Sequence, residues 1–193
     1  MAHEQFPPSG LAIRHGRDSD SEQLITLIES VYAEYPGCVL DVDGEAPHLR
    51  HPASAFAKWN GALWVMELNG GVAGCVGFAD HDEAVEVKHL YVASAARRQG
   101  LGSRLARLVE EAARERGRLQ VELWTDTRFT AAHRLYERLG YLRGPRTREL
   151  HDLSATVEYF YSKSLTSTPT AHARQECRLS RREWPASGCR GRS

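Results

Sequence analysis

The chain has 193 residues, of which 41% are hydrophobic and 26% charged, a composition typical of a globular domain with its own core. The 25 Lys and Arg residues balance the 25 Asp and Glu residues, so the overall charge favours neither nucleic acid nor an anionic membrane as a partner. No apolar run approaches the ~20 residues that cross a bilayer, and the first residues carry no secretory signal pattern, so we expect a cytoplasmic protein.

The two ends of the chain are expected to be disordered and to flank a single domain over residues 11–165. Residues 1–10 and 166–193 lack apolar periodicity, and the second segment is rich in Ser, Thr, Pro and Gly. That segment is also basic, because it carries six arginines against two glutamates. The cysteines are widely spaced and form no C-x-x-C pair, so we expect no metal site.

The first half of the domain predicts a strand, a helix and an irregular stretch. Residues 11–14 fit a short strand, and Asp18-Ser19-Asp20-Ser21 offers N-caps for a helix. The apolar residues that recur at helical spacing after it are Leu24, Leu27, Ile28 and Val31. Residues 36–60 contain three prolines and are expected to be irregular.

A hairpin and a third long strand come next. Two apolar runs, 62–68 and 72–79, flank Asn69-Gly70-Gly71, which predicts a hairpin because both glycines accept a positive φ. A strand over 83–92 follows, alternating until its last three residues.

The second half alternates helices with strands. The predicted elements are a helix over 102–116, a strand over 119–125, a helix over 130–139 and a strand over 155–165. Gly117 and Gly140 stand where glycines commonly end helices. The pattern predicts one mixed α/β domain of the α+β type.

Residues 90–103 are the most informative stretch of the sequence. A strand leads through a loop with Gly100 and Gly102 directly into a helix, so backbone N–H groups and the helix dipole point to one place. That arrangement suits a phosphate or pyrophosphate, and Arg97 and Arg98 add charge for the same anion. A Walker A loop is excluded because Gly102 is followed by Ser and Arg, and a dinucleotide fingerprint lacks its third glycine at Leu105.

Two motifs instead resemble the GNAT N-acetyltransferases. Arg97-x-x-Gly100-x-Gly102 is similar to their R/Q-x-x-G-x-G/A pattern, and residues 132–141, Ala-His-Arg-Leu-Tyr-Glu-Arg-Leu-Gly-Tyr, are similar to A-x-x-L-Y-x-x-x-G-F. The resemblance covers residues 11–165. It implies a twisted mixed sheet of about six or seven strands with about four helices, whose fourth and fifth strands splay apart around the pantetheine of acetyl-CoA.

The resemblance also implies which residues bind the coenzyme. The Leu90 N–H would face the acetyl carbonyl, Val92 would pair with the pantetheine amides, and the glycine loop would bind the pyrophosphate. The full predicted set is Leu90, Tyr91, Val92, Arg97, Arg98, Gln99, Gly100, Leu101, Gly102 and Ser103. Where family members often carry an Asn before the second motif, this chain has Phe129, and the adjacent Arg128 then becomes a candidate for the substrate.

Tyr136 and Glu86 are the candidate acid and base. Tyr136 matches the tyrosine that many GNAT enzymes place near the coenzyme sulfur, although an aromatic on a packing helix can equally be core. Glu86 lies four residues before Leu90, and alternation puts both on one face of the strand, although a Glu–Lys pair with Lys88 is an equal reading. His89 is then expected on the opposite face, as a structural residue.

The acceptor is the least determined part of the prediction. The regions that build the acceptor pocket in this family supply Tyr32, Tyr35, Asp41, Asp43, Glu45, Arg50, Arg128, Arg146 and Tyr161, of which we select Tyr32, Asp41, Arg50 and Arg128. Carboxylates suit a cationic amine and arginines a carboxylate, so a small, amino-acid-like acceptor fits both. The alternatives are an acetyltransferase for protein N-termini or lysines, and a non-catalytic acetyl-CoA sensor. A homodimer is compatible with the resemblance.

Overall fold

The computed structural model describes residues 10–81 and 83–165. The predictions of disorder for residues 1–9 and 166–193 fall outside this part of the chain. Within it, no helix is long and apolar enough to cross a membrane. The same residues contain no cluster of three or more His, Cys, Asp or Glu side chains suited to a metal ion.

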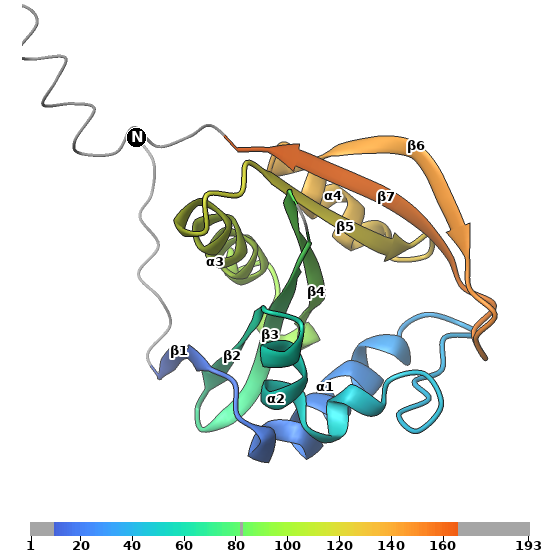
Figure 1. The fold of residues 1–193 in the computed structure, drawn as a ribbon. Helices are drawn as coiled ribbons and strands as arrows, with labels where there is room; N and C mark the ends of the chain where they lie inside the picture. Colours follow the sequence, from blue (N-terminus) through green and yellow to red (C-terminus); the bar gives the residue numbers. More distant parts are fainter. Residues whose placement is uncertain (1–9, 82, 166–193) are drawn as a thin grey trace, which may run out of the picture.

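Seven strands form one sheet in the order β1-β2-β3-β4-β5-β7-β6 (Figure 1). Neighbouring strands are antiparallel except β4 and β5, which are parallel. The strands are β1 Leu11–His15, β2 Ala62–Leu68, β3 Gly71–Asp80, β4 Ala84–Val92, β5 Gln120–Asp126, β6 Leu142–Glu149 and β7 Val157–Ser164. The mixed sheet of the predicted fold class is therefore confirmed.

Four helices cover the two faces of the sheet: α1 Ser21–Tyr32, α2 Pro52–Lys58, α3 Leu101–Glu115 and α4 Thr130–Arg138. Leu24 and Leu27 of α1 and Phe56 of α2 bury their side chains in one cluster on one face. Leu105 and Val109 of α3 belong to the main cluster on the other face, together with residues of α4. The ends of β4 and β5 lie between these two layers of helices (Figure 1).

The β2–β3 hairpin turns through Asn69 and Gly70, which have φ of +53° and +85°. Two successive positive φ values match the right-handed twist of the flanking strands, which explains the Asn-Gly pair. Gly71 already begins β3, so the turn uses the asparagine and one glycine rather than both glycines.

Two parts of the chain were not anticipated from the sequence. Residues 36–60 are not wholly irregular, because a short 3-10 turn, Pro47–Arg50, and α2 follow one another there, each with a proline at its start. The edge strand β6 reads Leu-Arg-Gly-Pro-Arg-Thr-Arg-Glu, without alternation, and its ladder to β7 breaks around its proline. Its arginines lie over aromatic rings, with Arg143 at 3.3 Å from the Tyr159 centroid and Arg146 at 3.6 Å from that of Phe160.

The sheet splits between β4 and β5, as expected. The two strands pair only over residues 84–87 and 120–123. Beyond them, β4 continues beside β3 and β5 continues beside β7. The gap that opens leaves the second half of β4 without a neighbour on that side, which makes its backbone groups available to a ligand.

A β-bulge interrupts β4 inside this gap. Lys88 pairs with Gly77 and Tyr91 with Cys75, so His89 and Leu90 together lie opposite one residue of β3. His89 has a φ of +53°, which L-residues rarely adopt. The bulge shifts the alternation by one residue, and Leu90 packs with the main cluster together with Val85 and Val87. The expectation that Glu86 and Leu90 share a face is therefore wrong.

Candidate active site

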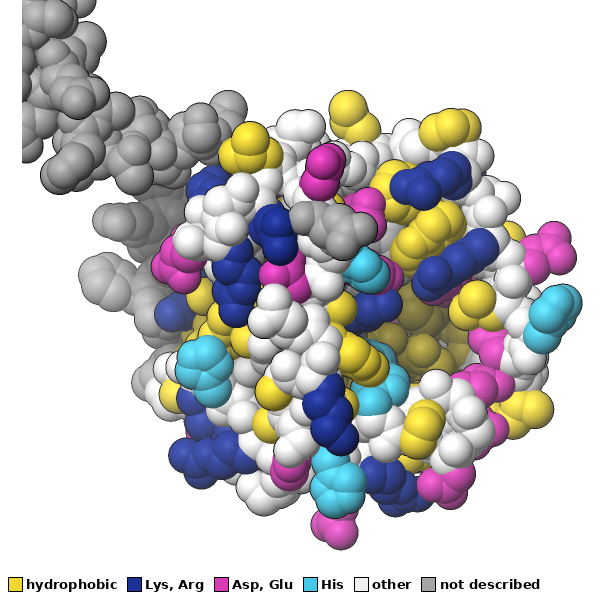
Figure 2. Space-filling view, in the orientation of Figure 1, with side chains coloured by type: hydrophobic (Ala, Val, Ile, Leu, Met, Phe, Trp, Pro, Cys, Tyr) yellow, Lys and Arg dark blue, Asp and Glu magenta, His cyan; other side chains and the backbone are white. Residues whose placement is uncertain are grey.

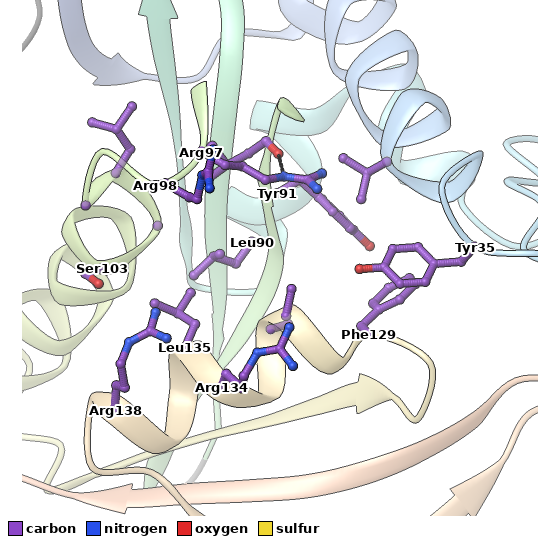
Figure 3. Close-up of a pocket in the computed structure, with 17 residues that line it drawn as sticks. Tyr35, Leu90, Tyr91, Arg97, Arg98, Ser103, Phe129, Arg134, Leu135 and Arg138 are labelled. Atoms are coloured by element: carbon purple, nitrogen blue, oxygen red, sulfur yellow. Dashed lines mark hydrogen bonds between the residues drawn. The ribbon is translucent and has the colours of Figure 1, made fainter. Parts of the chain in front are cut away.

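A cavity of about 460 Å³ lies at the N-terminus of α3 (Figure 3). Nine of the ten residues predicted to bind the coenzyme line it, and Gln99 is the exception. They come from the second half of β4, the glycine loop and the first turn of α3. The residues of the sequence motif thus line one cavity, and α4 forms the other wall of that cavity.

The glycine loop presents backbone donors to this cavity. Gly100 has a φ of +75°, and a Cβ at this position would meet no atom within 4 Å. The helix starts at Leu101, and its first backbone hydrogen bond is donated by the Arg104 N–H to the Gly100 carbonyl. The preceding N–H groups have no helical acceptor and no side-chain cap, so they are free for an anion.

Arg97 does not offer its charge to an anion as expected. Its guanidinium makes two hydrogen bonds with Glu34, at 2.5 and 2.7 Å, and its Nε donates to the Val92 carbonyl at 2.9 Å. Glu34 follows the end of α1, so Arg97 connects the loop to that helix and to β4. Figure 3 shows the Arg97 side chain beside Tyr91 of β4. Its function in the structure is to hold the loop in shape.

Two arginines of α4 add positive charge to the lining of this cavity. Arg134 and Arg138 line the cavity from one face of the helix, four residues apart, and Arg98 lines it from the loop (Figure 3). Their side chains form no ion pair among residues 10–81 and 83–165. Helical spacing within the second motif was the signal that could have indicated Arg134 and Arg138.

A second cavity of about 450 Å³ continues from the first. The two share four lining residues, Leu90, Tyr91, Phe129 and Ala132. Figure 2 shows the surface hollowed between the β6–β7 side and the α1 side, with hydrophobic side chains inside the hollow. A molecule in the first cavity can therefore reach one in the second at the bulge of β4.

Phe129 stands at this junction in place of the family's usual polar residue. Its ring packs against Tyr35, with centroids 4.6 Å apart, and against Tyr32, with centroids 5.7 Å apart. Phe129 therefore forms an aromatic wall that faces both cavities.

Tyr136 lies in the second cavity, in α4, with 5% of its surface exposed. Burial raises the pKa of its phenol above the ordinary value, so the hydroxyl is protonated at neutral pH and can donate. Its ring also packs edge-on against Tyr141, with centroids 5.6 Å apart. Tyr136 therefore packs in the core and also lines the second cavity, and its role as the acid stays a prediction.

Glu86 is buried but lines neither cavity. Its carboxylate accepts a hydrogen bond from Lys88 Nζ at 2.7 Å and lies 2.9 Å from His81 Nε2. The structure therefore contains the Glu–Lys pair that was the alternative interpretation of this sequence.

The residues proposed for the acceptor separate into two groups. Tyr32 lines the second cavity, and its hydroxyl lies 3.3 Å from that of Tyr91. Arg128 lies beside the cavity and is held by Asp126, with contacts of 2.6 to 3.0 Å. Asp41 and Arg50 do not line it: Asp41 accepts from the Gly44 N–H, and Arg50 pairs with Asp43 on the surface.

Two histidines in the second cavity were not singled out as a pair. The Nε2 atoms of His48 and His89 are 2.6 Å apart. His89 follows Lys88 at the bulge, and its ring faces Phe56 of α2 and Tyr91. His89 therefore lies on the same face of the sheet as Glu86, the face that α1 and α2 cover, and not on the opposite face as expected. No sequence signal links His48, in a loop turn, with a histidine of β4.

Acid should destabilise the protein through this pair. Burial, together with the nearby charge of Lys88, lowers the pKa of both rings below the ordinary histidine value, to about 3 for His89. Below about pH 6.5 the unfolded chain then binds protons that the folded protein excludes, so the free energy of unfolding falls by up to about 1.4 kcal/mol per pH unit for each ring.

Denaturant unfolding between about pH 7 and about pH 5 measures this dependence. His89→Asn, which keeps a residue type tolerant of positive φ, should show a shallower decline than the wild type. An identical pH dependence in the variant would contradict a neutral buried histidine.

Comparison with known proteins places the chain in a family. The model of the acetyltransferase (GNAT) family matches residues 25–141. The chain belongs to this family and is an acetyl-CoA-dependent N-acetyltransferase.

Individual relatives agree with that assignment. The N-acetyltransferase YjgM of Escherichia coli (strain K12) is 30% identical over 140 residues, which cover 69% of this chain and 83% of the relative. The human N-acetylaspartate synthetase is 34% identical over 116 residues, but these cover 58% of this chain and only 36% of that protein.

Solved structures show the same fold. A GNAT acetyltransferase from Staphylococcus aureus Mu50 superposes with a TM-score of 0.70 at 20% identity, covering 81% of this chain and 99% of that one. The acetyltransferase yncA of Salmonella typhimurium, solved with acetyl-CoA, has a TM-score of 0.62 at 20% identity and covers 84% and 99%.

Proposed function

We propose that the protein transfers the acetyl group of acetyl-CoA to the primary amine of a small acceptor held in the second cavity. The observation that carries this proposal is the pair of connected cavities that share Leu90 at the β4 bulge. One matches the coenzyme motif and the other offers about 450 Å³, within the range of small-molecule pockets.

The chemistry follows from the junction. The amine nitrogen bonds to the acetyl carbon and the C–S bond breaks, so a negative charge develops on the carbonyl oxygen and then on the sulfur. We assign the Leu90 N–H to the oxygen, because the gap between β4 and β5 leaves that stretch of backbone without a strand partner. We assign Tyr136 to the sulfur, because its protonated phenol faces the cavity on the far side of the junction.

The lining supports an amine as the acceptor. Four carboxylates face the second cavity, those of Glu45, Asp126, Asp152 and Glu158. Among the described residues that line it, none is Lys or Arg. Arg128 contacts Asp126 at the edge and is the group that an acceptor carboxylate would meet. The name N-acetylaspartate synthetase of one set of relatives agrees with an amino-acid-like acceptor.

A panel of amines tests the proposal. Release of free thiol from acetyl-CoA is measured with polyamines, amino acids, arylalkylamines and short peptides that have a free N-terminus or a lysine. We expect turnover with small amines, and little with peptides, because the volume of about 450 Å³ is that of a small-molecule pocket. Preference for peptides would favour the protein acetyltransferase, and binding of acetyl-CoA without thiol release from any amine would favour the sensor.

A further inference from the structure

Two of the three histidines that line the second cavity, His48 and His89, form one hydrogen-bonded unit; the third is His151. Their Nε2 atoms are 2.6 Å apart and the ring centroids 4.8 Å. One ring must donate a proton to the other, because two lone pairs at this distance would repel and two protons would clash. His48 belongs to the Pro47–Arg50 turn and His89 to the bulge of β4, so the contact joins the sheet to the loop over it.

The backbone holds His89 in a conformation that its residue type seldom adopts. Its φ of +53° belongs to the left-handed region, and its carbonyl accepts a hydrogen bond from the Cys75 thiol at 3.1 Å. Such a conformation persists where the surroundings enforce it, commonly at functional sites. At His89, the residue before Leu90 in the sequence, this conformation directs the imidazole into the second cavity.

The surroundings keep the pair uncharged. Phe56 packs edge-on against the His89 ring, and Trp59 packs against His48. The ionisable groups around the pair are the Lys88 ammonium, the Tyr91 phenol and the Cys75 thiol, with the Glu45 carboxylate on the same cavity wall. Desolvation and the positive charge of Lys88 both lower the histidine pKa values.

We propose that His48 and His89 together take the proton of the acceptor amine and pass it to solvent. This inference rests on the proposed acetyl transfer to an amine. The pair lines the cavity that holds the acceptor, and His89 directly precedes the residue whose N–H we assign to the carbonyl oxygen. Glu86, the base expected from the sequence, lines neither cavity and is occupied by Lys88 and His81.

The protons balance along this path. After the amine nitrogen bonds to the acetyl carbon it loses its second proton to water, but an amine that enters as an ammonium must lose a first proton before it can attack. The imidazole that donates the shared proton has a free lone pair on its Nδ1, and this atom accepts that first proton. Its Nε2 proton then moves to the Nε2 of the partner ring, whose Nδ1 proton leaves to water through half-buried His48. Tyr136 gives its proton to the sulfur and is reprotonated from solvent.

The test compares His48→Gln and His89→Asn with two kinds of acceptor. The first is the fastest aliphatic amine of the panel, which is charged at neutral pH, and the second is hydroxylamine, which is mostly neutral there. For the aliphatic amine we expect kcat/KM near pH 7 to fall by about 10²-fold, the low end for general base catalysis. The loss should shrink as the pH rises, and it should be much smaller for hydroxylamine.

Matched variants separate this role from a structural one. His51→Gln changes an exposed histidine next to the same turn but outside both cavities, and should keep the wild-type rate. Both cavity variants should still be stabilised by acetyl-CoA, which shows that they are folded. A single fold-change for both acceptors at every pH would overturn the relay, as would wild-type rates in both variants.

Glu86→Gln provides the competing assignment. If this variant alone shows the loss that depends on amine charge, Glu86 is the base and the histidine pair is not. If the wild type acetylates no amine at all, the proposed function itself fails, and that result is recognised before any histidine variant is made.

Discussion

Gly100→Val should abolish acetyl-CoA binding while the protein stays folded. A Cβ at Gly100 points into open space at the first cavity, so the two methyl groups of valine would occupy the place where the coenzyme phosphates meet the N-terminus of α3. The φ of +75° adds strain of about 1–2 kcal/mol for any L-residue, which a domain of ordinary stability survives.

Thermal unfolding with and without acetyl-CoA measures the effect. At about 100 times its Kd, the coenzyme should stabilise the wild type by about 2.7 kcal/mol, and it should not shift the Tm of the variant. Gly117→Val is the matched control: its φ is +70°, its Cβ also meets open space, and it lies at the other end of α3. It should lose the same stability and keep the full shift. A normal shift in Gly100→Val would remove the loop from the coenzyme site.

The cavity at the N-terminus of α3 could be predicted because its information is local in the sequence. The strand, the two glycines and the helix start occupy residues 90–103 without interruption, and nine of the ten residues chosen there line one cavity. The β2–β3 hairpin was predictable for the same reason, since Asn69 and Gly70 specify the turn whatever packs around it. Prediction worked where the conformation depends on a few adjacent residues.

Prediction failed where packing overrides periodicity. The alternation of β4 suggested that Glu86 and Leu90 share a face, but a single bulge at His89 reversed the phase of the strand. No residue type at this position signals a bulge, because His89 adopts a conformation that histidine seldom adopts. Strand β6 was missed because it has no apolar alternation: it pairs with β7 at the edge of the sheet, and its arginines lie over aromatic rings.

The acceptor cavity could not be predicted because its walls come from distant segments. The packing of α1 and the Pro47–Arg50 turn over β4 brings His48 to His89 and Tyr32 to Tyr91. Residue type alone also placed the positive charge of the site on the wrong arginine. Arg97 matches the family motif but is paired with Glu34. Arg134 and Arg138 match no motif position, yet they line the first cavity. The motif specifies where the site is, and the tertiary contacts decide which side chains serve it.

Tyr136→Phe should lower kcat by about 10²–10⁴-fold if proton donation to the departing sulfur limits the reaction. The ring and its edge-on contact with Tyr141 remain, so the fold and the KM for acetyl-CoA should change little. Because burial keeps the phenol protonated, the defect should persist across the neutral pH range.

Tyr141→Phe is the control that isolates the position of the hydroxyl. Tyr141 is as deeply buried as Tyr136, and its ring packs against the Tyr136 ring, but it lines neither cavity. Both variants lose one buried hydroxyl, so any shared effect on stability or packing appears in both. Only Tyr136→Phe should lose turnover, measured by thiol release with the fastest amine of the panel. Equal and near-normal kcat values in the two variants would make Tyr136 a packed aromatic, and the thiolate would then leave unassisted or take its proton from water.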